Sequence, residues 1–183
     1  ALEGGLLGLA TASGQAAQFT AIANILQAGD NLVSTSYLYG GTYNQFKAQF
    51  PRIGINVKFV DSNDPEAFAN AIDDKTRAIF CESVSNPALE ITDLEKVSSI
   101  AKTHGIPVVV DATFSTPYLT QPLAHGCDII IHSLTKWLGG HGSGIGGIVI
   151  DSGRFNWGAG KHPLYDEPDT SYHGLRWGHD LPE

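Results

Sequence analysis

Residues 127–140 read CDIIIHSLTKWLGG, an apolar run followed by hydroxyl residues, a lysine and glycines. The apolar run predicts a buried strand, and Lys136 stands just past its end. A lysine ammonium must lose a proton before it can attack an aldehyde, so burial that lowers its pKa favours Schiff-base chemistry. Ser133 and Thr135 could hold a phosphate beside Lys136. A solvated lysine at a strand end is an equally simple alternative for this peptide alone.

Two further strand-like runs upstream end in acids. One run ends in Glu82, with Asn86 shortly after, and another ends in Asp111. In a parallel sheet the ligand site lies beyond the carboxyl ends of the strands, so we expect these side chains and Lys136 at one edge. A carboxylate beside a pyridine nitrogen keeps that nitrogen protonated, a role that suits Asp111. An acid that caps the loop after its strand is the alternative.

Strands and helices alternate along the chain, with no sequence repeat and no low-complexity linker. This alternation predicts an α/β fold with a mainly parallel sheet and helices on both faces. The expected strands cover residues 31–34, 56–60, 78–82, 108–111, 128–132 and 147–151. The expected helices cover residues 14–28, 43–50, 65–72 and 93–104, with a short turn over 121–125.

The helix expected over 14–28 provides an anion site at its start. Free N–H groups and the positive end of the helix dipole bind phosphate at such a position. Ser13 is suited to cap the same helix, and capping is compatible with phosphate binding. The glycine-rich tract 139–147 does not link a strand to a helix. We therefore interpret it as a flexible loop after the lysine rather than a dinucleotide-binding motif.

Composition limits the class of protein. The chain has 183 residues, 42% of them apolar, and a formal net charge of −8. Lys and Arg are scattered singly, so no nucleic-acid partner is expected, and no apolar run is long enough for a membrane partner. Cys81 and Cys127 are interpreted as reduced core residues, which together with the lack of a basic signal-peptide flank favours a cytoplasmic location. The spacing of His125, His132, His141 and Cys127 fits no metal site.

Five segments of the chain together resemble a known family. They are 2–5 (LEGG), 10–17 (ATASGQAA), 38–44 (LYGGTYN), 133–142 (SLTKWLGGHG) and 171–174 (SYHG). In this order they resemble the pyridoxal-phosphate (PLP) enzymes of cysteine and methionine metabolism, and most of all the branch that acts on O-acetylhomoserine. The resemblance implies the large domain of a fold-type I PLP-dependent transferase, with a mainly parallel seven-stranded sheet and helices on both faces.

The resemblance implies three catalytic residues. Lys136 would hold pyridoxal 5′-phosphate as a Schiff base and act as a base, Asp111 would contact the pyridine nitrogen, and Tyr39 would stack on the ring and assist proton transfer. The family usually has Asn after the strand-end Asp, whereas this chain has Ala112. The residues implied to bind the cofactor are Ser13, Gly14, Gln15, Tyr39, Glu82, Asn86, Asp111, Thr113, Ser133, Thr135 and Lys136, and no metal is implied.

The resemblance also implies a reaction, a γ-replacement that converts O-acetyl-L-homoserine and sulfide to L-homocysteine and acetate in methionine biosynthesis. The alternatives are a cystathionine γ-synthase, a methionine or cystathionine γ-lyase, and a truncated remnant that binds the cofactor without turnover. Residues 1–183 are expected to form only the cofactor-binding large domain, without the N-terminal arm and C-terminal small domain of the family. Family members complete their sites with a neighbouring subunit, so we expect a homotetramer built as a dimer of dimers.

Overall fold

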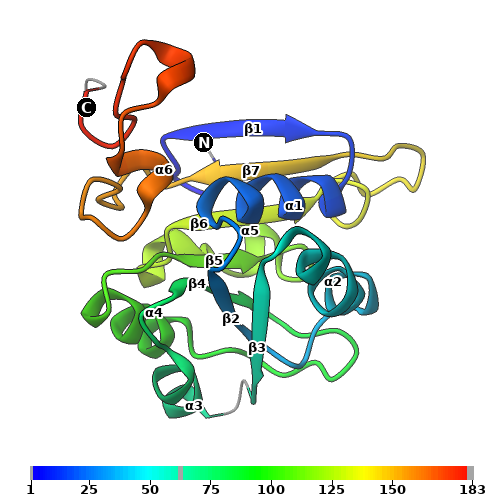
Figure 1. Ribbon diagram of the computed structural model, residues 1–183. Coiled ribbons are helices and arrows are strands. Elements are labelled where there is room, and N and C mark those ends of the chain that lie inside the picture. The colour runs from blue at the N-terminus through cyan, green and yellow to red at the C-terminus, as the bar shows by residue number, and fades with distance from the viewer. Residues whose placement is uncertain (1, 62–63, 181–183) are drawn as a thin grey trace.

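The computed structural model describes residues 2–61 and 64–180 and has one sheet at its centre (Figure 1). Within these residues the sheet has seven strands in the order β1-β7-β6-β5-β4-β2-β3. The strands from β3 to β6 in this order are parallel neighbours, whereas β7 is antiparallel to both β6 and β1. The prediction of a mainly parallel sheet is confirmed. The strand bounds are β1 (Leu7–Thr11), β2 (Asn31–Thr35), β3 (Asn56–Val60), β4 (Thr76–Glu82), β5 (Val108–Asp111), β6 (Ile129–Ser133) and β7 (Gly147–Asp151).

Helices cover both faces of the sheet, as the alternation predicted (Figure 1). One buried cluster joins α1 to the sheet through Ile22 and Phe80, and a second joins α3 and α4 to the opposite face through Phe68 and Val97. The helix bounds are α1 (Gly14–Ile25), α2 (Gly40–Asn44), α3 (Pro65–Ala71), α4 (Leu94–Thr103), α5 (Thr116–Leu119) and α6 (Pro163–Asp166), with 3₁₀-helices at Phe50–Ile53, Pro122–His125 and Thr170–Tyr172.

Two predicted helices differ from the observed ones. The helix expected over 14–28 ends at Ile25, because Leu26 turns to an extended conformation and enters the core. The helix expected over 43–50 is a continuous run of α2, a π-helix over Gln45–Gln49 and a 3₁₀-helix. Pro51 lies at the start of that 3₁₀-helix and lacks the N–H that an α-helix would need.

Strand β1 is absent from the sequence-based prediction. Four of its five residues are exposed, so the strand has no buried face that an apolar alternation would mark. It is held instead by antiparallel pairing with β7 along one edge. The four-residue helices α5 and α6 are also absent from the prediction, since neither is long enough to show a helical period.

The parallel strands β4, β5 and β6 end at one edge of the sheet. Glu82 pairs with Asp111 across β4 and β5, and Asp111 pairs in turn with Ile131 on β6. One residue further along β6, the buried His132 has its Nε2 atom 2.6 Å from the equally buried Oε1 of Glu3. This contact fastens the N-terminal segment to the strand that leads to Lys136.

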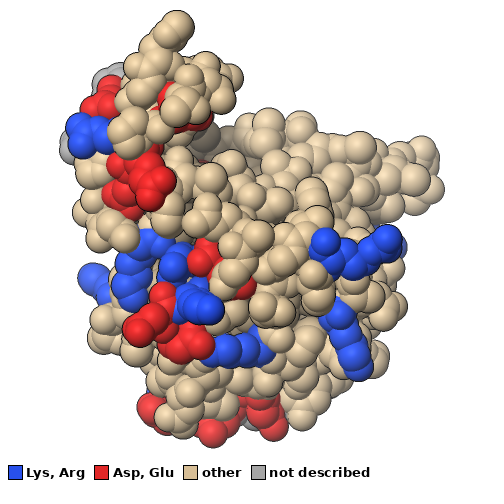
Figure 2. Space-filling view, in the orientation of Figure 1, with Lys and Arg blue, Asp and Glu red and all other residues tan. Residues whose placement is uncertain are grey.

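Charged side chains of both signs share the surface. On the face drawn in Figure 2, Lys and Arg form small separate groups, several of them mixed with Asp and Glu. Across the described ranges, no helix combines the length and apolar character that spanning a bilayer requires. Cys81 and Cys127 are buried and free, in agreement with their interpretation as reduced core residues.

Candidate active site

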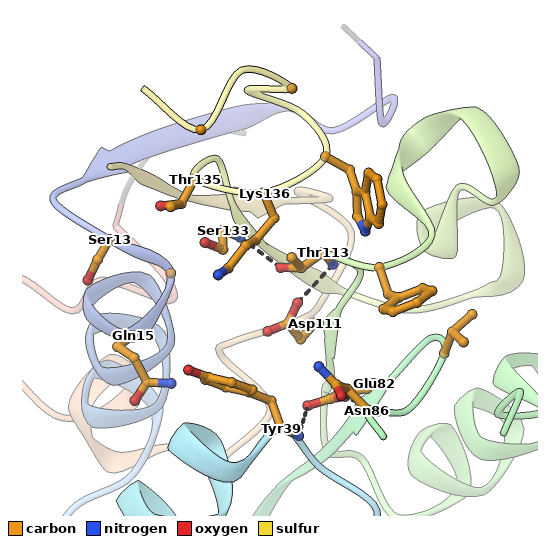
Figure 3. A pocket seen from close by; sticks show the side chains of 16 residues that line it. Ser13, Gln15, Tyr39, Glu82, Asn86, Asp111, Thr113, Ser133, Thr135 and Lys136 are labelled. Atoms are coloured by element: carbon orange, nitrogen blue, oxygen red, sulfur yellow. Dashed lines mark hydrogen bonds between the residues drawn. The ribbon is translucent and has the colours of Figure 1, made fainter. Parts of the chain in front are cut away.

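A cavity of about 610 Å³ opens where β4, β5 and β6 end (Figure 3). All eleven residues that the family resemblance assigned to the cofactor line this one cavity. The lining also includes five residues to which the resemblance assigned no role: Val84, Phe114, Trp137, Gly140 and Gly142. Trp137, Gly140 and Gly142 belong to the segment 133–142 that carries the resemblance, and Phe114 directly follows Thr113 in the chain.

The N-terminus of α1 forms one end of the cavity. Ser13 caps this helix, because its Oγ accepts the Ala16 N–H at 3.1 Å and its carbonyl accepts the Ala17 N–H at 2.9 Å. The N–H groups of Gly14 and Gln15 have no acceptor inside the helix, and both residues line the cavity. These N–H groups and the helix dipole make this end suitable for an anion.

Two hydroxyl residues from the end of β6 complete the anion-binding end. A Cβ on Gly14 would lie 2.6 Å from the Cβ of Ser133, so only glycine lets α1 approach Ser133 so closely. Thr135 is held by the loop that follows: its Oγ1 accepts the Gly146 N–H at 3.2 Å and donates to the Gly146 carbonyl at 3.3 Å. The anion-binding end is therefore built from two separate segments packed against each other.

Lys136 lies on the turn after β6, and its amine points into the cavity (Figure 3). The residue is exposed, which agrees with the alternative of a solvent-accessible lysine at the strand end. Burial stops earlier, because β6 ends at Ser133 and the chain then turns along the rim. An amine in this position is accessible to a ligand that enters from solvent.

Asp111 faces the cavity from the end of β5. Its Oδ1 accepts the Thr113 N–H at 2.8 Å, and Thr113 Oγ1 accepts the Ser133 N–H at 2.7 Å. Burial raises the pKa of Asp111 above its ordinary value, and the hydrogen bonds from Thr113 oppose this effect in part. A cation bound beside Asp111 would favour the charged carboxylate.

Glu82 lies beside Asp111 at the end of β4. Its Oε1 accepts the Tyr39 N–H at 2.7 Å and its Oε2 accepts the Asn86 N–H at 3.1 Å. Burial, and then the negative charge of Asp111, raise the pKa of Glu82 to about 8. This end of the cavity therefore contains two carboxyl groups whose ionisation is opposed by their surroundings.

Aromatic side chains border the cavity on two sides. The ring of Tyr39 lies over Gly41, where a Cβ would come within 2.5 Å of the ring Cε1. Across the cavity, Phe114 and Trp137 form an edge-to-face pair with ring centroids 6.3 Å apart. Trp137 is 65% exposed, so this pair forms part of the cavity mouth rather than of the core.

Comparisons with known proteins agree with this geometry. The family model for the Cys/Met metabolism PLP-dependent enzyme matches residues 1–166. The O-acetyl-L-homoserine sulfhydrylase of Leptospira meyeri is 56% identical over 177 residues, which are 97% of this chain and 40% of that protein. The homocysteine/cysteine synthase of Saccharomyces cerevisiae is 52% identical over 177 residues, 95% of this chain and 40% of that protein. The chain thus spans about two fifths of the length of these curated relatives.

A solved structure shows the same fold. The putative O-acetylhomoserine (thiol)-lyase of Campylobacter jejuni superposes with a TM-score of 0.95 at 40% identity, over 99% of this chain and 46% of that chain. That structure contains N′-pyridoxyl-lysine-5′-monophosphate. The similarity confirms the fold-type I architecture.

Proposed function

Because this chain belongs to the family of Cys/Met metabolism PLP-dependent enzymes, we propose that its cavity binds pyridoxal 5′-phosphate for a γ-replacement on O-acetyl-L-homoserine. Sulfide replaces acetate in this reaction and L-homocysteine is the product, a step in methionine biosynthesis. The observation that carries the proposal is the Lys136 amine, which points into a cavity between an anion-binding helix end and Asp111. Residues 1–183 are assigned to the cofactor-binding domain as part of the same proposal.

The lining residues fit the cofactor at both of its ends. The N–H groups of Gly14 and Gln15, with the hydroxyl of Ser133, suit a phosphate dianion. The buried carboxyl group of Asp111 suits a protonated pyridine nitrogen, because the cation removes the cost of burying a lone negative charge. Because Gly14 has no Cβ, the start of α1 packs directly against Ser133 and brings its first N–H groups close to the Ser133 hydroxyl.

Each catalytic residue acts at a defined atom. The cofactor, when bound, supplies the electron sink for a carbanion at the substrate Cα. Lys136 would hold the cofactor covalently until the substrate amine displaces it, and its freed amine would then take the proton from Cα and later return one. Asp111 keeps the proton on the ring nitrogen, and the hydroxyl of Tyr39 assists proton transfer at Cβ. Acetate leaves from Cγ, and sulfide forms its new bond to the same carbon.

Borohydride reduction tests the assignment of Lys136. The protein loaded with pyridoxal 5′-phosphate should give a pyridoxyl label on the peptide that contains Lys136, and Lys136→Ala should give none. Lys102→Ala, which changes an exposed lysine on α4, serves as the matched control and should be labelled like the wild type. Labelling of a different lysine in the wild type would refute the assignment.

Substrate assays separate the γ-replacement from its sister reactions. We expect homocysteine from O-acetyl-L-homoserine and sulfide at a higher rate than cystathionine from O-acetyl-L-homoserine and cysteine. Elimination from methionine or cystathionine should be slower still. A fastest reaction with cysteine would identify a cystathionine γ-synthase instead, and a fastest elimination would identify a γ-lyase.

The proposal includes a homotetramer in the cytoplasm. Two neighbouring large apolar side chains on α5 are exposed, Tyr118 at 91% and Leu119 at 72%, and exposed apolar surface is typical of interfaces. The buried free thiols of Cys81 and Cys127 are compatible with a reducing compartment. Light scattering with an activity assay on the same dilution series tests the assembly, and a fully active monomer would refute it.

A further inference from the structure

Glu82 makes a contact that the proposed reaction does not use. It is 5% exposed, yet both of its carboxylate oxygens bind backbone N–H groups of residues that are themselves exposed. Tyr39 belongs to the segment after β2 and begins α2, whereas Asn86 belongs to the turn after β4. One buried side chain therefore joins two segments that approach the cavity from different strands.

Figure 3 shows Tyr39, Glu82 and Asn86 close together in the lower part of the cavity, where Glu82 contacts the Tyr39 N–H group. The second oxygen of Glu82 accepts the Asn86 N–H, so one carboxylate contacts both segments. The backbone of Glu82 is fixed in its turn, since its carbonyl accepts the Thr92 hydroxyl at 2.7 Å. The carboxylate is thus a short rigid link from the sheet edge to both segments.

We propose that Glu82 is a positioning residue whose two oxygens hold the N–H groups of Tyr39 and Asn86 and so set the width of the cofactor cavity between them. This inference rests on the proposed function for its consequence, because Tyr39 and Asn86 matter here as neighbours of the cofactor ring. The two hydrogen bonds from Tyr39 and Asn86 to Glu82 are present in the protein without cofactor.

Electrostatics connects this link to cofactor binding. Asp111 stands opposite Glu82 in the strand register, and its charge disfavours the ionised form of Glu82. A cationic ring nitrogen against Asp111 offsets that repulsion and favours the carboxylate that accepts two N–H groups. Cofactor binding and the hydrogen bonds from the two segments to Glu82 therefore stabilise each other.

Hydrogen exchange of the cofactor-free protein tests the link directly. In Glu82→Gln only one acceptor oxygen remains and the amide NH₂ faces a backbone N–H, so segment 37–44 or segment 84–90 should exchange about tenfold faster at pH 8.5. Exchange in β5 should not change. Glu95→Gln, an exposed glutamate on α4, is the matched control. Unchanged exchange in both segments would overturn the proposal.

A second variant, Glu82→Asp, keeps the test valid if Glu82→Gln fails to fold. Glu82→Asp retains the charge but is one methylene shorter, so it reaches one N–H group and releases the other. We expect faster exchange in one of the two segments and continued protection of the other. Protection of both segments in Glu82→Asp would overturn the proposal as well.

Measurements of cofactor binding distinguish a positioning role of Glu82 from a purely structural one. In Glu82→Gln the dissociation constant of pyridoxal 5′-phosphate should rise about tenfold, with weaker circular dichroism of the bound cofactor and the borohydride label still on Lys136. An unchanged dissociation constant and dichroism would refute the positioning role. If the wild type takes no label on Lys136, the proposed function fails, while the exchange result still decides whether Glu82 links the two segments.

Discussion

The two ends of the cavity are built by different means. At the α1 end, the contacts come from backbone N–H groups and short hydroxyl side chains, none of which carries a formal charge. At the other end, the carboxyl groups of Glu82 and Asp111 stand on paired residues of adjacent strands. Burial raises the pKa of both groups, so ionisation of the two carboxyl groups is disfavoured until a cation binds beside them.

The difference predicts two kinds of sensitivity. A site made of backbone N–H groups tolerates many side-chain changes, but it fails when a new Cβ displaces the helix that carries those groups. A site made of buried carboxyl groups loses its function when the charge of a carboxyl group is removed, even if the new side chain has the same shape. We therefore expect the largest loss of cofactor affinity from a change at the α1 end and the largest loss of turnover from a change of Asp111 at the carboxyl end.

Asp111→Asn should have the largest effect and should separate the two ends. The amide keeps the size of the carboxyl group but cannot hold the ring nitrogen protonated, so turnover should fall about 100-fold or more. The α1 end is untouched, so the dissociation constant of pyridoxal 5′-phosphate should change by about threefold or less. Steady-state kinetics and a cofactor titration of the same protein measure both quantities.

The matched control for this variant is Asp74→Asn, which changes an exposed acid before β4 and should leave both quantities unaltered. Near-normal turnover of Asp111→Asn would show that another group serves the ring nitrogen. A large loss of cofactor affinity without loss of turnover would reverse the assignment of the two ends.

Gly14→Ala should have the next largest effect, at the opposite end. The added Cβ would meet Ser133 at 2.6 Å and force α1 away from β6, so the dissociation constant of pyridoxal 5′-phosphate should rise about thirtyfold. Turnover at saturating cofactor should change far less. Gly40→Ala is the matched control, since Gly40 is the first residue of α2 and a Cβ there meets no heavy atom within 4 Å. Equal affinities for the two variants would contradict the role given to the α1 end.

The sequence predicted every strand that has at least a partly buried face. The strands β3, β5 and β7 were predicted with their observed bounds, and β2, β4 and β6 to within two residues at each end, because apolar or alternating runs mark strands that pack at least partly on the core. Strand β1 was missed because edge pairing holds it without a buried face. The π-helix over Gln45–Gln49 also has no local signal, since it depends on how Phe46 and Phe50 fit the core.

The candidate site shows a similar division. Lys136 and Asp111 could be found from their places after strands, and the family resemblance added the other cofactor residues. The link from Glu82 to the N–H groups of Tyr39 and Asn86 could not be found, because backbone hydrogen bonds leave no trace in residue identity. The sequence left the exposure of Lys136 open, since it depends on how the chain turns after β6.

The smallest expected effect is a pH dependence that the carboxyl end alone should show. The folded-state pKa of Glu82 is about 8, above the ordinary value of 4.5, so the folded protein binds this proton more tightly than the unfolded chain. The resulting stability is fully present below about pH 4.5 and is lost as the pH rises through 8. The raised pKa of Asp111 acts in the same direction.

Chemical denaturation of the cofactor-free protein from pH 5 to 8 should therefore show a fall of about 1–2 kcal/mol in the free energy of unfolding. Asp128, with a pKa of about 6, contributes with the same sign but only in the lower part of this range. The difference between wild type and Glu82→Gln should thus appear between pH 6 and 8, where the variant should be flatter, while Glu95→Gln should follow the wild type. Bound pyridoxal 5′-phosphate should also flatten the wild-type curve, because its cationic ring offsets the charge of Asp111. Parallel curves for wild type and Glu82→Gln would show that the pKa of Glu82 is not raised in the folded protein, which would contradict this prediction.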